Sequence, residues 1–473
     1  MIRVRARVHD KFSLEFKVWF EKNMLPDSGK ETDYRLESWI FLPASLDVNA
    51  LTYSREQFYS AIKSYYRTIT PVYLLEDLAI AKIGSPLEFL SNAVFNIIGH
   101  RSKSNLSEYE YQIKMYCAIF KSAIREKYNI LKKEPTPQLL SDFSSSVYAV
   151  LRSYGSLSGK IKEDTDEKLY PLFSLGEEFL INLTELYVYK VYNITGEKIE
   201  SLKKIEEYKL ERGYKVLTRD GGLANSNIIY RWSVLKKYIE SDLFLSVDKR
   251  KDGVLTEQVY YSIAAGLSMI FATVVSFSFQ QKYGNFTIPF FIALVISYML
   301  KDRIKELIRY AFTTNRKLKY FDNKIKLAVK ETEIGESKEG FDIVPQSKVP
   351  QKIMETRNRS YMGEMENRIS QENVLFYRNL IKLDRKKLSL TSNYKIDGVN
   401  EIIFFNLMDY VKKMDNPQNP YFITEGKTVS EILVDRVYYI NFIFQLSCSD
   451  GSYVKRYRIM LNRNGILNLE EIE

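Results

Sequence analysis

The stretch Val259–Leu300 reads VYYSIAAGLSMIFATVVSFSFQQKYGNFTIPFFIALVISYML and consists of two apolar segments joined by a short polar turn. Val259–Phe279 contains no charged residue, and as a helix it would span about 31 Å, roughly the thickness of a bilayer core. Tyr283–Leu300 would span about 27 Å, with Pro289 in its first turns, where a missing amide donor does least harm. The sequence therefore predicts an antiparallel pair of transmembrane helices over residues 258–300.

Basic residues flank both outer ends of this segment, whereas the turn contains only Lys282. The flanking residues are Lys249, Arg250 and Lys251 before the first helix and Lys301, Arg303, Lys305 and Arg309 after the second. Because positive charge concentrates on the cytoplasmic side, we expect a multi-pass protein of the cell (inner) membrane with both termini cytoplasmic. The alternative is an apolar hairpin buried in a large soluble core. The charge-free length and the basic flanks argue against that alternative.

Small residues recur at every fourth position of the first predicted helix, with a similar pair on the second. They are Ala264, Ser268, Ala272 and Ser276, followed by Ala293 and Ser297. Such rows allow helix backbones to approach closely in membranes. We expect them to pack the two helices against each other; self-association of several hairpins through this face is the alternative.

Residues 301–330 begin with a basic amphipathic stretch, Lys301–Tyr320. We expect contact between anionic lipid head groups and Lys301, Arg303, Lys305 and Arg309. The stretch is equally compatible with a stalk helix that packs on the soluble regions.

The remainder of the 473-residue chain, with 45% hydrophobic and 27% charged residues, is typical of folded domains. Strict alternation at the N-terminus predicts a β-hairpin, spacings of three and four over Leu106–Leu131 predict a helix, and alternation over Tyr438–Leu469 predicts a three-stranded meander. Glu331–Pro350, rich in charge, Gly and Pro, is expected to be a loop or interrupted hairpin at a boundary. The predicted class is α+β, with a small α+β region at 1–70, a helical bundle at 71–246, the membrane hairpin, the basic helix, and an α+β region at 331–473.

Residues typical of catalysis or metal binding are scarce. The two cysteines are far apart and the two histidines lie in no recognisable motif. Gly155-Ser-Leu-Ser-Gly-Lys-Ile161 departs from a phosphate-binding loop in spacing and lacks its hydroxyl residue. We therefore predict no catalytic residue, cofactor or metal site, although carboxylates that converge from distant positions would escape this reasoning.

Three functions are consistent with these observations. The first is a non-enzymatic, membrane-anchored interaction or sensor protein with cytoplasmic regions. The second is an oligomerising membrane effector that opens or disrupts the bilayer, of toxin or defence type, and the third is a membrane-tethered enzyme. The expected partners are the bilayer, anionic head groups, and another protein or a second copy. Because lipid accounts for the modest charge of +10, nucleic acid is not expected as a partner.

Overall fold

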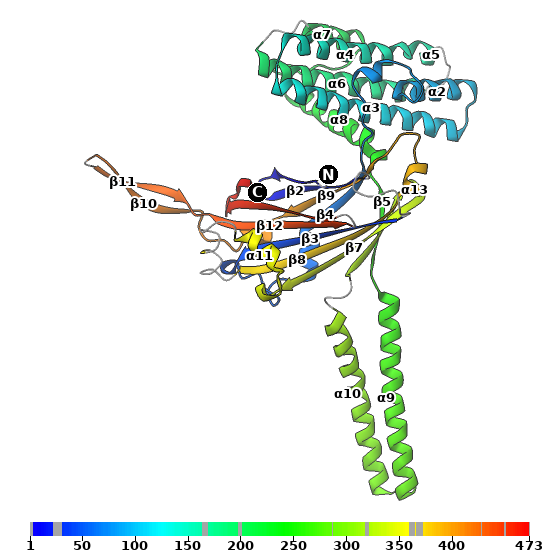
Figure 1. The fold of residues 1–473 in the computed structure, drawn as a ribbon, viewed down its shortest axis with the longest axis vertical. Coiled ribbons are helices and arrows are strands. Elements are labelled where there is room, and N and C mark those ends of the chain that lie inside the picture. The colour runs from blue at the N-terminus through cyan, green and yellow to red at the C-terminus, as the bar shows by residue number, and fades with distance from the viewer. Residues whose placement is uncertain are drawn as a thin grey trace. The chain divides into compact units, whose positions relative to one another are not determined.

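The fold is mixed α+β, with helices and several antiparallel sheets, in a computed structural model that divides into two compact units. Unit 1 comprises Met1–Tyr66, Ser246–Leu388 and Asn400–Glu473, and unit 2 comprises Arg67–Leu245 and Ser389–Val399. The structure describes residues 3–21, 31–162, 169–196, 201–285, 287–316, 321–358, 365, 372–426, 428–448 and 451–472. Figure 1 shows the elements in chain order.

An eight-stranded antiparallel sheet forms the frame of unit 1, in the order β14-β13-β12-β3-β8-β7-β6-β5. Its strands are β3 (Glu31–Pro43), β5 (Ser246–Lys251), β6 (Asn323–Val329), β7 (Thr332–Val344), β8 (Glu372–Asp384), β12 (Tyr438–Cys448), β13 (Gly451–Asn462) and β14 (Gly465–Ile472). The predicted C-terminal meander is present as β12 to β14. Because β3 pairs with both β8 and β12, the regions predicted at 1–70 and 331–473 share one sheet.

A second sheet, in the order β1-β2-β9-β4, packs on the first. Its strands are β1 (Arg3–Asp10), β2 (Ser13–Glu21), β4 (Ile62–Thr68) and β9 (Gly398–Asn406). The predicted N-terminal hairpin is present, with Val4 opposite Val18. Phe16 on β2 lies 5.0 Å from Phe442 and 4.8 Å from Phe444 on β12, measured between ring centroids, so part of the core of unit 1 lies between the two sheets. A separate buried cluster includes Trp39, Ile353 and Ile443.

Strand β7 differs from the predicted loop at Glu331–Pro350. It runs between β6 and β8 in the interior of the sheet, and its charged residues have partners. Glu336 pairs with Lys324, and Asp342 lies 2.9 Å from Arg55. The Gly and acidic residues that indicate a loop in the sequence are therefore accommodated within a strand by ion pairs that the sequence does not reveal.

Short helices connect the strands of unit 1. They are η2 (Ala44–Leu46), α1 (Arg55–Ala61), η5 (Gln346–Lys348), α11 (Gln351–Arg357), α13 (Arg385–Leu390) and α14 (Met408–Val411). Helix α1 begins with a capping box, in which the Ser54 hydroxyl accepts from the Gln57 amide and the Gln57 side chain accepts from the Ser54 amide. The sequence also predicts a helix over Val349–Arg368; only its α11 part can be described, because 359–364 and 366–371 lie outside the described residues.

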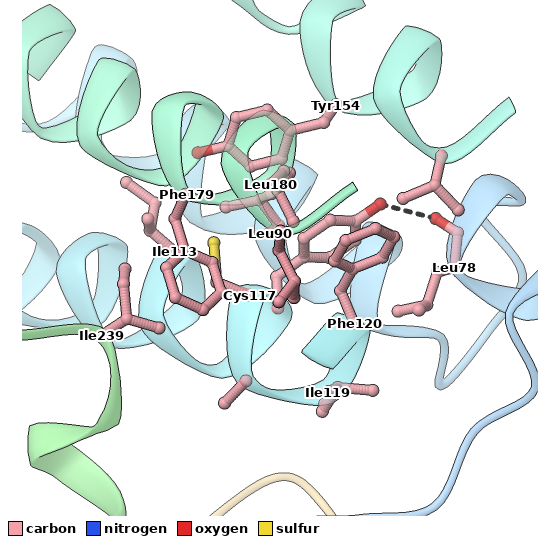
Figure 2. Packing of buried hydrophobic residues seen from close by; sticks show 14 of the residues in the cluster. Leu78, Leu90, Ile113, Cys117, Ile119, Phe120, Tyr154, Phe179, Leu180 and Ile239 are labelled. Atoms are coloured by element: carbon pink, nitrogen blue, oxygen red, sulfur yellow. Dashed lines mark hydrogen bonds between the residues drawn. The ribbon is translucent and has the colours of Figure 1, made fainter. Parts of the chain in front are cut away.

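Unit 2 is a bundle of helices. They are η3 (Glu76–Ala79), α2 (Pro86–Gly99), α3 (Lys103–Lys133), α4 (Pro137–Ser156), α5 (Ser158–Lys162), α6 (Leu169–Thr195), α7 (Ser201–Glu211), α8 (Gly222–Glu240) and η4 (Ser241–Leu243). Figure 2 shows part of its core, where Ile113, Cys117 and Phe120 of α3 face Phe179 and Leu180 of α6. Tyr116 donates a 2.8 Å hydrogen bond to the carbonyl of Leu78, so even its phenol is satisfied in this core.

Two hairpins remain in unit 1. Helices α9 (Val254–Tyr283) and α10 (Ile288–Arg316) lie side by side, and strands β10 (Gln418–Glu425) and β11 (Thr428–Asp435) form a separate two-stranded sheet (Figure 1). The first hairpin contains the predicted apolar segments.

Candidate functional site

The helical hairpin is inserted between two neighbouring strands of the eight-stranded sheet. β5 and β6 are antiparallel, with Lys251 opposite Asn323, and the amide of Asp252 donates to the carbonyl of Asp322 over 3.0 Å. The chain therefore leaves the sheet and returns to it at the same place.

A small polar cluster holds this base. Asp322 accepts from the Arg55 guanidinium (2.8 Å), from the Tyr59 hydroxyl (3.0 Å) and from the Phe341 amide (2.8 Å). Two of these donors are on α1 and one is on β7, so two elements hold the residue that directly precedes β6. Charge-assisted bonds of this kind are about twice as strong as neutral ones.

The small-residue row lies where the two helices meet. Ala264 and Ser268 of α9 are buried, as are Ala293 and Ser297 of α10, whereas Ala272 and Ser276 are half-buried. The Ser297 hydroxyl donates to the Ala272 carbonyl of the other helix over 3.2 Å. A side-chain oxygen this close to the opposite backbone requires small residues at the crossing.

The boundaries of the two apolar segments differ from the prediction. α9 extends through Tyr283, and α10 starts only at Ile288, so the apolar part of α10 shrinks to Ile288–Leu300, about 20 Å of helix. Of the described helices, α9 alone is long and apolar enough to cross a membrane. The prediction of a transmembrane pair, with the second helix the shorter, is therefore not confirmed: among the described helices only α9 has the required length and composition.

Two contacts between the helices determine where the basic residues of α10 lie along α9. Ser297 contacts α9 at Ala272, and the Arg309 guanidinium lies 4.7 Å from the ring centroid of Tyr261. The basic residues between these contacts, Lys301, Arg303 and Lys305, therefore lie alongside the first half of α9, not beyond it. The hairpin is apolar on both helices only in the half nearer its tip.

The outer surface of that half is strongly apolar. A stretch of eighteen residues in α9 has a mean hydropathy of 1.8, and only 11% of it is buried. The exposed apolar side chains include Leu267, Met269, Ile270, Val274 and Phe277 of α9, and Phe291, Ile292, Val295, Ile296 and Met299 of α10. Soluble proteins rarely expose a contiguous apolar surface of this kind.

Hydroxyl groups on this surface are satisfied within their own helix. Ser262, Thr273 and Ser278 each donate to the carbonyl four residues earlier, at 2.9, 2.9 and 2.8 Å. Ser276 does the same to Ala272 over 2.8 Å. Such bonding removes the need for water as a partner, so these groups are compatible with a lipid environment.

The four basic residues predicted to meet lipid head groups differ in exposure. Arg303 is exposed, while Lys301, Lys305 and Arg309 are half-buried. The Lys301 ammonium lies 4.2 Å from the centroid of the Tyr298 ring, and Arg309 pairs with Glu306 at 3.4 Å. Their long side chains can extend along the helix toward a polar interface. Residues 317–320 of the predicted basic helix lie outside the described part.

A buried polar network in unit 1 was not predicted. Both carboxylate oxygens of Glu401, on β9, accept hydrogen bonds from the side-chain amide of Asn379, on β8, at 3.0 and 2.9 Å. Asn379 also donates to the Tyr66 hydroxyl (3.2 Å), and Ser337 bridges the Tyr66 hydroxyl and the Asn379 carbonyl oxygen. A second buried carboxylate, Glu339, accepts from Tyr377. These residues come from strands far apart in sequence, so no motif could have revealed them.

Burial dominates the electrostatics of this network. Desolvation and the nearby charge of Glu339 raise the pKa of Glu401 to about 8, although hydrogen bonds from Tyr66 and Asn379 act in the opposite direction. The Lys249 ammonium of β5 forms an ion pair with the Glu339 carboxylate, at 2.6 Å between Nζ and Oε2. Both carboxylates are almost completely buried, so a substrate could not reach them without opening the sheets. We interpret the network as structural.

No protein-family model, curated protein or solved structure matches this chain. The function is therefore inferred from the geometry of the hairpin.

Proposed function

We propose that the chain is a membrane-anchored interaction or sensor protein without enzymatic activity, held at the cytoplasmic face of the cell (inner) membrane by the α9–α10 hairpin. One observation carries the proposal. The one described helix that is long and apolar enough to cross a membrane, α9, is only 11% buried over its apolar stretch. A core helix of a soluble protein would have buried this surface, so its natural environment is lipid.

The base of the hairpin supports an anchor with all folded mass on one side. Since Asp252 and Asp322 are joined by a backbone hydrogen bond, the strands on either side cannot be separated by a bilayer. Both termini then lie on the same side, and the exposed Arg303 is in place to meet anionic head groups.

Two features favour an anchor over a membrane-opening effector. Ser268 and Ser297, the centre of the small-residue row, are already buried between the helices of a single hairpin, so the row does not offer a surface for further copies. The hydroxyls that would line a pore donate to carbonyls of their own helix. The effector remains the second candidate, and it predicts leakage from vesicles that contain the reconstituted protein, whereas the anchor predicts none.

The geometry of the base permits a clean deletion. Because Lys251 and Asn323 are already cross-strand neighbours, residues 253–321 can be replaced by Asn-Gly, the favoured two-residue turn of a β-hairpin. We expect the intact chain to stay in the membrane pellet after alkaline carbonate extraction and the deleted chain to be soluble. Release of the intact chain by carbonate would refute the anchor. Circular dichroism and the fluorescence of Trp39 in β3 and Trp232 in α8 verify that both units of the deleted chain are folded.

The depth of insertion is a separate question, because about 20 Å of apolar α10 is shorter than a bilayer core of ~30 Å. We propose that the hairpin still crosses, with Lys301 and Arg303 extending to the interface. A cysteine replacing Asn285 in the turn should then react with an impermeant thiol reagent added outside spheroplasts. Protection of this position in intact spheroplasts, with labelling after lysis, would mean that the hairpin only dips into one leaflet.

A further inference from the structure

The β10–β11 hairpin, called the arm below, exposes apolar side chains on both of its faces. Tyr421 lies opposite Ile432 on one face, and Pro420 lies opposite Leu433 on the other, beside Phe422. Phe422 is 72% exposed and Leu433 is 64% exposed. A two-stranded ribbon is marginally stable alone in water, and a strand pair that buries neither face gains little from its own side chains. The arm therefore requires a partner surface.

The sequence of the arm determines which edge can pair. Pro420 has no amide hydrogen, and within sheets proline is tolerated where its nitrogen faces away from the ladder. The outer edge of β10 thus lacks a donor in its middle. β11 contains no proline and pairs with β10 without a register shift, so its outer edge has a complete row of donors and acceptors.

Charge then distinguishes the possible partner strands. β11 contains Glu431 and Asp435 and no basic residue. Of the two strands that end the eight-stranded sheet, β14 contains Glu470 and Glu471 and would repel β11. β5 contains three basic residues; Lys249 pairs with Glu339 and Arg250 with Asp248, which leaves Lys251 as the basic residue offered to a partner strand. All six residues of β5 are exposed, and its ladder with β6 has no bulge.

We propose that β11 of one copy adds to the outer edge of β5 in a second copy of this chain, and that the exchange is reciprocal. Each chain contributes one arm and accepts one, which closes a two-fold symmetric dimer. The charges also oppose the wrong pairings, since β5 with β5 brings basic residues together and β11 with β11 brings acidic residues together.

Another basic edge strand, β1, is less suited to this role. Its Val4 carbonyl already accepts a 2.6 Å hydrogen bond from the Tyr457 hydroxyl, and Arg7 pairs with Glu15. Part of its edge is therefore used within the chain, and it is this contact that distinguishes the two strands, since basic residues of both β1 and β5 form ion pairs. The acidic residues of the arm likewise argue against an anionic lipid surface as its partner. The inference goes beyond membrane anchoring and does not require it, because the proposed contact lies outside the α9–α10 hairpin.

The test is the oligomeric state of the full chain in mild detergent, measured by light scattering over a dilution series. Wild type should be a dimer. Glu431→Lys alone and Lys251→Glu alone should each weaken the dimer about tenfold or more, because each change makes the charges of the two strands less complementary. The two changes together should restore most of the affinity. Glu126→Lys, which makes the same charge change at an exposed position of α3, should have no effect.

A chain whose residues 418–435 are replaced by a short Gly-Ser turn should be monomeric, with its membrane retention unchanged. The proposal is overturned by a monomeric wild type, by a dimer that survives this deletion, or by a double charge exchange that fails to restore association. Chemical crosslinks from the arm to β1 in place of β5 would also overturn it. Loss of vesicle binding on deletion, with a monomeric wild type, would instead identify the arm as a lipid-binding element.

Discussion

Replacing Glu401 by glutamine should change the pH dependence of unfolding in a defined direction. The carboxyl is buried beside Glu339, and its pKa in the folded chain is about 8 against an ordinary value of 4.5. Between these two values the folded state holds a proton that the unfolded state has lost. The stability contributed by this proton is fully present below pH 4.5 and is lost as the pH rises through 8.

The size of the effect follows from the shift. At about 1.36 kcal/mol per pKa unit, the raised pKa corresponds to at most about 5 kcal/mol between pH 4.5 and 8. Glu401→Gln keeps an oxygen that accepts from Asn379 but cannot ionise. The variant should therefore be more stable than wild type at pH 8.5 by a few kcal/mol, with the difference shrinking steadily toward pH 5.

The assay is urea unfolding in detergent at several pH values, followed by the fluorescence of Trp39, which is stacked on Phe376 in unit 1 at 4.0 Å between ring centroids. The difference between variant and wild type removes the contributions of other titrating groups. A difference that stays constant from pH 5 to 8.5 would refute the reasoning, since it would mean that Glu401 does not change its protonation in this range.

Three further substitutions test the packing. Ser268→Leu, at a buried position between α9 and α10, should lower the thermal stability of the hairpin in detergent by about 1–3 kcal/mol, whereas Val274→Leu on the exposed face should change it little. Gly176→Ala should destabilise unit 2 by about 1–3 kcal/mol, because the added Cβ would meet the Tyr154 hydroxyl, and Gly159→Ala, where the space is open, is the matched control in urea unfolding. Asp322→Ala should lower the free energy of unfolding of unit 1 by about 2 kcal/mol and increase hydrogen exchange at the amides of Asp252 and Phe341. Unchanged exchange at these amides would contradict a stabilising role of the polar cluster at the base of the hairpin.

The sequence predicted those elements whose signal is local. The β1–β2 hairpin, the meander β12 to β14, and helix α1, which the capping-box pattern Ser54-Arg-Glu-Gln57 predicts, all follow from alternation, caps and turns within a few residues. The sequence predicts a loop or interrupted hairpin where strand β7 lies, because the ion pairs of its charged residues with Lys324 and Arg55 are not visible in the sequence.

The site was predicted in part for the same reason. Apolar composition located α9 and α10, but their relative register depends on contacts such as Ser297 with Ala272, which only the folded hairpin supplies. The buried network around Glu401 joins β4, β7, β8 and β9, separated by up to hundreds of residues, and no spacing rule links them. The apolar residues of the arm resemble an ordinary strand until their exposure is known.

The position of β3 has a consequence for biosynthesis. This strand is made within the first 43 residues, yet both of its neighbours, β8 and β12, begin only at Glu372 and Tyr438. During synthesis both edges of β3 therefore lack their native partner strands until the ribosome has produced most of unit 2 and the whole α9–α10 hairpin. The hairpin therefore emerges before the sheet that carries it exists, and under the proposed membrane anchoring the nascent chain could be delivered before unit 1 folds. Chains that stop before residue 372 leave β3 without a partner and exposed to aggregation.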